Sequence, residues 1–150
     1  MTKENSSVFR LGEILIQNKG VSWEQMQEAL TIQRASGRLI GDILVEKGYV
    51  SLQNLYRALA AQYQMSFIEF EKLNIPPEVI KLLDNHTVYE YNLIPLILKN
   101  EVLLIAICDP RNIRPETELK KLFPNFEIRI AMAAPDDLAK ALLKYYGPKK

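Results

Sequence analysis

The stretch from Arg10 to Gln33, RLGEILIQNKGVSWEQMQEALTIQ, returns in altered form from Leu39 to Gln62 as LIGDILVEKGYVSLQNLYRALAAQ. The two stretches are offset by 29 residues (39 − 10), and eight of their 24 paired positions are identical. The identical pairs are Gly12/Gly41, Ile14/Ile43, Leu15/Leu44, Val21/Val50, Ser22/Ser51, Ala29/Ala58, Leu30/Leu59 and Gln33/Gln62. Average residue usage predicts only about one or two identities. The first half of the chain is therefore a duplicated unit.

Each copy has the apolar spacing of a short first helix. In the first copy Leu11, Ile14 and Leu15 follow the i, i+3, i+4 spacing that places apolar side chains on one helical face. This helix is expected to start near Arg10 and to end near Lys19-Gly20, because a basic residue followed by glycine is typical of helix C-termini.

A second helix in each copy has a clear start signal. Ser22 is the expected N-cap, and Gln25 completes a capping box. Val21 and Met26 are placed to form a hydrophobic staple across this start. The second copy repeats these signals with Val50, Ser51, Asn54 and Leu55. Four helices in two similar hairpins are expected to pack as a small bundle.

The pattern changes after Gln62 to mixed helices and strands. The expected elements are an extended link at 65–70, a helix at 77–83, strands at 91–98 and 101–108 joined by a turn at Lys99-Asn100, a helix at 115–123, an alternating strand at 126–132 and a helix from Pro135 to about Tyr146. The predicted fold class is α+β, with a three-stranded sheet in the second part. The predicted organisation is a flexible tail at 1–8, a helical repeat subdomain at 9–66, an α/β subdomain at 67–147 and a tail at 148–150.

Composition excludes several classes of function. The net charge is +1, which gives no broad attraction to nucleic acid or to an anionic membrane. Cys108 is the one cysteine, which excludes an intrachain disulfide and fits a reducing cytoplasm. No apolar run is long enough to cross a bilayer. His86, the one histidine, has no neighbouring metal ligand, and no GxxxxGK[ST] phosphate loop is present. We therefore expect a soluble, non-catalytic protein without a metal cofactor.

Two copies of the pattern RLGxxL…(L/M)xxALxxQ, followed by the strand and loop of residues 104–110, LIAICDP, resemble the MshEN family. This family is the amino-terminal domain of type II secretion and type IV pilus assembly ATPases, and the resemblance covers residues 9–147. It implies a regulatory module in the bacterial cytoplasm, either free or held at the inner membrane by a protein partner. Some members bind cyclic di-GMP through the paired motifs, whereas others dock onto an inner-membrane platform protein, so both functions stay open.

The paired motifs supply groups suited to a cyclic dinucleotide. Arginine can clamp a phosphate or stack on a purine, free amides at a helix start attract an anion, and glutamine can pair with a base edge. An aspartate can accept hydrogen bonds from guanine, and leucines can pack on base faces. The candidate ligand-binding residues are Arg10, Leu11, Gly12, Leu30, Gln33, Arg38, Ile40, Gly41, Leu59, Gln62 and Asp109.

Most of the candidates also have a purely structural interpretation. Arg10 could be a solvated surface residue, and Gly12 and Gly41 could serve close helix packing. The leucines could be core residues, the glutamines could be ordinary polar residues near helix ends, and Asp109 could cap the local turn.

The second motif departs from the family pattern at its first position. Leu39 stands where the first copy has Arg10, and Arg38 precedes it. Along a helix this one-residue offset rotates the side chain by roughly 100°, which is expected to take Arg38 away from the position that Arg10 occupies in the first copy. The second half of the ligand site is therefore expected to bind more weakly than the first, or not at all, while the fold is kept.

Overall fold

The computed structural model describes the backbone of residues 3–18 and 20–150, and the side chains of this part from residue 10 onward. It divides the chain into two compact units, Met1–Gln64 and Met65–Lys150. The division follows Gln64, two residues before the boundary predicted from the sequence. Each unit is described by itself below.

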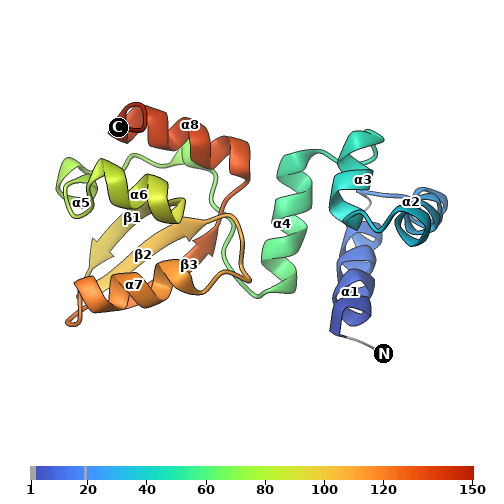
Figure 1. The fold of residues 1–150 in the computed structure, drawn as a ribbon, viewed down its shortest axis with the longest axis horizontal. Coiled ribbons are helices and arrows are strands. Elements are labelled where there is room, and N and C mark those ends of the chain that lie inside the picture. The colour runs from blue at the N-terminus through green and yellow to red at the C-terminus, as the bar shows by residue number, and fades with distance from the viewer. Residues whose placement is uncertain (1–2, 19) are drawn as a thin grey trace. The chain divides into compact units, whose positions relative to one another are not determined.

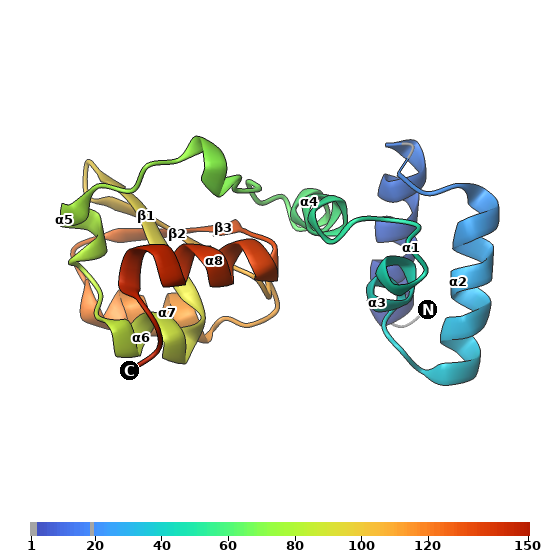
Figure 2. The ribbon, with the colours of Figure 1, turned by 90° about the horizontal axis from the view of Figure 1, so that it is seen from above.

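The first unit consists of the four helices of the repeat (Figures 1 and 2). They are α1 (Lys3–Gln17), α2 (Trp23–Ser36), α3 (Ile40–Glu46) and α4 (Leu52–Gln62). Helix α1 packs against α4, and α2 packs against α3. The predicted tail at 1–8 is wrong for residues 3–8, which form the first two turns of α1. Residues 1 and 2 and Lys19, part of the expected end of this helix, lie outside the described residues.

The expected caps are present. The Ser22 hydroxyl accepts from the Gln25 amide at 3.1 Å, and the Gln25 side chain accepts from the Ser22 amide at 3.0 Å, so the capping box is confirmed. In the second copy Ser51 accepts from the Asn54 amide at 3.1 Å. Helix α2 ends at Gly37, whose φ of 73° is left-handed and strongly favours glycine.

The core of the first unit is made from the repeated positions. Its paired buried side chains are Leu11/Ile40, Leu15/Leu44, Val21/Val50, Met26/Leu55 and Ala29/Ala58. Ile43 is also buried, whereas its counterpart Ile14 is partly buried. Both copies therefore bury nearly the same face, and the repeat in sequence is a repeat in packing.

The second unit is a three-stranded sheet with helices (Figure 1). Its elements are the 3₁₀ helix η1 (Phe70–Lys72), α5 (Pro77–Ile80), α6 (Asn85–Tyr91), β1 (Leu93–Lys99), β2 (Val102–Ile107), α7 (Arg114–Leu122), β3 (Glu127–Met132) and α8 (Pro135–Tyr146). The strand order is β1-β2-β3, with β1 antiparallel and β3 parallel to β2. Helices α5, α6 and α8 pack against β1, and α7 packs against β3. Together with the helical unit, this confirms the predicted α+β class.

The ends of the second unit are tied to its body. The extended link contributes a bridge between Phe67 and Met132 beside β3. At the other end, the Asn85 side chain donates to the carbonyl oxygens of Tyr146 and Pro148 at 3.0 Å and accepts from the Lys150 amide at 3.0 Å. Residues 148–150, predicted as a tail, are therefore hydrogen-bonded to the first residue of α6.

Three local predictions in this unit are wrong. The hairpin turn is Asn100-Glu101 rather than Lys99-Asn100, and both of its residues have positive φ, 52° and 64°. This conformation matches the twist of the flanking strands, although glutamate rarely adopts it. The helix expected at 77–83 is the shorter α5. The first residue of the expected strand, Tyr91, instead ends α6, a helix that the sequence analysis missed.

Candidate ligand-binding site

Arg10 lies in the middle of α1, not at a helix start. Helix α1 begins at Lys3, so the amides near Arg10 fall within the helix and lack the unpaired donors of a helix N-terminus. The expected anion site on these amides is therefore wrong. The Arg10 side chain is exposed, and it has no hydrogen bond or ion pair with any residue in the described part of the chain. A phosphate bound here would contact the guanidinium group.

The two motif glycines hold helices close together. A Cβ atom on Gly12 would lie 3.6 Å from Met26 Sδ, and one on Gly41 would lie 2.9 Å from Leu55 Cδ2. Gly12 and Gly41 are repeat partners, as are Met26 and Leu55. The equivalent glycine in each copy thus faces the equivalent side chain of the following helix. This arrangement favours the packing interpretation of the glycines over close approach to a ligand.

The four apolar candidates separate into two pairs. Leu11 and Ile40 are 5% and 6% exposed and belong to the core, so they present almost no surface to a base. Leu30 and Leu59 pack against the same core but are only partly buried. Leu11 and Ile40, predicted as ligand contacts, are therefore core residues. Of the four, only Leu30 and Leu59 can offer apolar surface to a ligand.

The two candidate glutamines occupy equivalent positions with different burial. Gln33 is half-buried in the last part of α2, where its carbonyl oxygen accepts from the Gly37 amide at 2.8 Å. Gln62 ends α4 and is 9% exposed. Gln33 is followed by three further residues of α2 and therefore lies in the last turn of this helix. Its side chain is the more accessible of the two.

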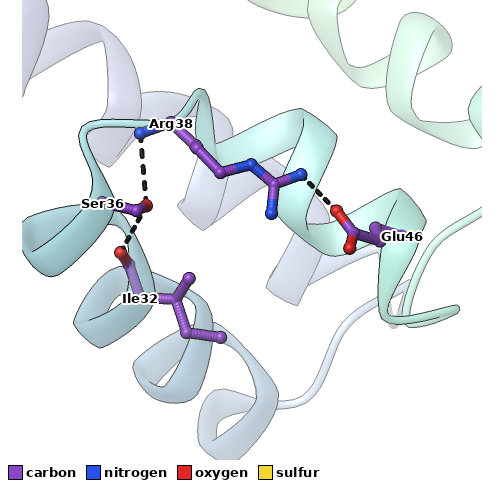
Figure 3. Close-up of polar contacts among 4 residues, drawn as sticks. All are labelled: Ile32, Ser36, Arg38 and Glu46. Carbon is purple, nitrogen blue, oxygen red and sulfur yellow. Dashed lines mark hydrogen bonds and ion pairs between the residues drawn. The ribbon is translucent and has the colours of Figure 1, made fainter.

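Arg38 lies in the connection between α2 and α3, and its guanidinium group pairs with Glu46 at the end of α3 (Figure 3). The Ser36 hydroxyl donates to the Ile32 carbonyl oxygen at 2.7 Å and accepts from the Arg38 amide at 3.3 Å. Leu39 is the N-cap of α3 with extended backbone, at φ −68° and ψ 136°. The rotation expected for a helical one-residue offset therefore does not apply to Arg38.

Asp109 belongs to the second unit and has a local partner there. Its Oδ1 accepts from the Arg111 amide at 3.0 Å and from Arg111 Nε at 3.3 Å. This is the turn-capping role that the sequence left open. The neighbouring Cys108 is buried, and burial, with smaller contributions from Asp109 and Asp136, raises the pKa of its thiol to about 12.

Three side chains that the sequence analysis missed form polar contacts between the two copies. Glu28 on α2 forms an ion pair with Lys47 at 3.2 Å and accepts from the Tyr49 hydroxyl. The Tyr49 hydrogen bond is the largest cause of a lowered pKa of Glu28. The repeat partners of these residues are Arg57, Asn18 and Gly20, so the comparison of the two copies gave no signal. Glu46, the partner of Arg38, was missed for the same reason, because its counterpart is Gln17.

Among the described residues, no group of histidine, cysteine, aspartate and glutamate side chains is arranged to hold a metal ion. In the same part of the chain, every helix is too short or too polar to span a bilayer.

The family model described as the MshEN domain matches residues 63–150, more than half of the chain. The chain belongs to the MshEN family. The segment matched by the MshEN model comprises the whole α/β unit and the last two residues of the helical unit. The resemblance noted in the sequence rested first on the helical repeats, which precede the matched segment.

Individual MshEN relatives extend the similarity to the repeats. The chain is 29% identical over 140 residues to the type IV pilus assembly ATPase PilB of Myxococcus xanthus, covering 93% of this chain and 25% of the relative. It is 36% identical over 110 residues to PilB of Thermus thermophilus, covering 73% of this chain and 12% of that protein. The structure of MshE with cdg (cyclic di-GMP) superposes with a TM-score of 0.72 at 26% identity, covering 91% of this chain and 99% of that one. The chain thus spans a quarter or less of the two pilus ATPases.

Proposed function

We propose that this MshEN domain is a non-catalytic regulatory module that binds cyclic di-GMP through its helical repeat. The observation that carries the proposal is the similarity to MshE with cyclic di-GMP, which extends over 91% of the chain and therefore includes the repeat. The first motif retains Arg10, Gly12 and Gln33 in the positions that define the family pattern.

The described residues of the helical unit supply the chemistry that the ligand requires. Arg10 is exposed and can donate to a phosphate oxygen or stack on a guanine ring. Leu30 and Leu59 offer apolar surface at equivalent places in the two copies. The Gln33 side chain can offer both a donor and an acceptor to a base edge. These residues, with Arg38 as the second cation, are the contacts we propose.

The relatives support a place for the module in a larger machine. Both pilus relatives are assembly ATPases, and the chain matches only a minor part of their length. Since the sequence contains no phosphate loop, we assign no ATP hydrolysis to these residues. In this proposal the module reports ligand binding to an ATPase core in the bacterial cytoplasm.

A second function, docking onto an inner-membrane platform protein without a nucleotide, is favoured by Leu39. This leucine replaces the motif arginine and is 60% exposed. An apolar side chain at a cationic position suits a protein contact better than a phosphate contact.

Isothermal titration calorimetry of the purified chain with cyclic di-GMP separates the two functions. We expect a micromolar or lower Kd that Arg10→Ala abolishes. Arg34→Ala, which removes an equally charged and exposed residue from α2, serves as the control and is expected to leave binding intact. Absence of heat at millimolar ligand would reject the nucleotide function. Binding to the cytoplasmic part of the platform protein that survives Arg10→Ala would then establish docking.

A further inference from the structure

Arg38 directly precedes Leu39, the residue that replaces the motif arginine in the second copy. Its guanidinium group forms an ion pair with Glu46 (Figure 3). Arg10, the corresponding cation of the first copy, has no such partner among the residues that the structure describes. The two copies therefore offer a phosphate one open guanidinium and one that already holds a carboxylate. We infer that Glu46 is an internal competitor that holds Arg38 away from a phosphate ligand. This inference rests on the proposed binding of cyclic di-GMP.

The backbone around Arg38 is held in place by hydrogen bonds, so the position of its Cα atom is defined. Gly37 closes α2 in the left-handed conformation. The Ser36 hydroxyl bridges the Ile32 carbonyl oxygen and the Arg38 amide. From this anchored loop, the Arg38 side chain runs beside α3 to Glu46 (Figure 3). Release of the guanidinium group therefore requires rotation of the side chain alone.

The placement of the two charges is unfavourable for α3 itself. Arg38 lies just before the N-terminus of α3, and Glu46 is its last helical residue. A helix favours negative charge at its N-terminus and positive charge at its C-terminus, the reverse of this arrangement. Each charge is therefore unfavourable for the α3 dipole, and their mutual attraction offsets this cost. The stability of α3 does not explain why these two charges are present.

The pair is weak enough for a ligand to displace it. The side chains of Arg38 and Glu46 are 46% and 64% exposed, so solvent screens their attraction. A cyclic dinucleotide carries two phosphates and can replace the carboxylate with a charge-assisted, bidentate contact. Glu46 would lower the affinity by the contribution of one exposed ion pair, about twofold to fivefold.

The test is titration calorimetry with cyclic di-GMP on the full chain at low salt. We expect Glu46→Gln to bind about twofold to fivefold more tightly than the wild type, with the gain reduced in concentrated salt. Glu24→Gln removes an equal charge from an exposed position on α2 and is expected to bind like the wild type. In an Arg38→Ala background, Glu46→Gln is expected to have no effect.

The outcomes separate this inference from the function on which it rests. Wild-type binding that Glu46→Gln leaves unchanged or weakens overturns the competitor role and keeps the proposed function. An equal gain from Glu24→Gln also overturns the competitor role, because it indicates a general charge effect. Binding by neither the wild type nor Glu46→Gln overturns both. Urea unfolding provides a second measurement: the competitor role allows Glu46→Gln to lose at most the small contribution of one exposed ion pair, and a larger loss of stability would overturn it in favour of a structural role.

Discussion

Alanine substitutions at the two motif glycines are predicted to change stability in opposite directions. Gly12 lies inside α1, where alanine is favoured over glycine by about 0.5–1 kcal/mol. Its new Cβ would sit 3.6 Å from Met26 Sδ, an ordinary contact. At Gly41 the new Cβ would sit 2.9 Å from Leu55 Cδ2, and Leu55 is only 4% exposed. Such overpacking costs about 1–3 kcal/mol, which exceeds the helical gain.

We therefore expect Gly12→Ala to be slightly more stable than the wild type and Gly41→Ala to be less stable by about 0.5–2 kcal/mol. Trp23, the one tryptophan of the chain, lies in the helical unit, so its fluorescence during urea unfolding reports on that unit. With a slope of about 1 kcal/mol per molar urea, the two midpoints should differ by about 1 M or more.

The close contact with Leu55 is the cause to be verified. The cost of Gly41→Ala should shrink in a Leu55→Ala background, because the opposing methyl groups are then absent. Equal midpoints for Gly12→Ala and Gly41→Ala, or a cost at Gly41 that is independent of Leu55, would refute the packing role of the motif glycines.

Two further predictions concern the capping box and the buried thiol. Ser22→Ala and Ser51→Ala should each destabilise the helical unit by about 1 kcal/mol, because each removes one hydroxyl that accepts from a helix-start amide at 3.1 Å; an unchanged urea midpoint for either variant would contradict this. Cys108, whose pKa burial raises from 9.0 to about 12, should resist thiol reagents at pH 8 until the unit unfolds. Because the folded state favours the neutral thiol, its contribution to stability should be full below pH 9 and be lost between pH 9 and about 12; rapid labelling of the native chain would refute its burial.

The helical repeat could be predicted in detail because each local signal agreed with the others. The capping box at Ser22 and the paired core positions such as Met26 and Leu55 were readable from one copy and supported by the other. Helix α6 could not be read in this way, because its residues 85–91, NHTVYEY, have low helix propensity. It forms because Val88 is fully buried, Asp84 caps the N-terminus by accepting from the Thr87 amide at 2.8 Å, and Asn92 adopts positive φ.

The candidate site was predictable in its residue types but not in their surroundings. The spacing identified Arg10 but gave no signal for the first turns of α1, so the helix start was placed too late. The offset of Arg38 was read as a rotation about a helix, whereas the residue lies in an extended loop. Its partner Glu46 is eight residues away in sequence, and no repeat or motif marks that contact.

Titration of the ¹⁵N-labelled chain with cyclic di-GMP, followed by amide chemical shifts, tests the central claim most directly. We predict saturable shifts in the helical unit at Arg10, Gln33, Arg38 and Gly41, and loss of these shifts in Arg10→Ala. Unchanged spectra at millimolar ligand, or shifts confined to residues 65–150, would contradict a nucleotide site built on the repeat.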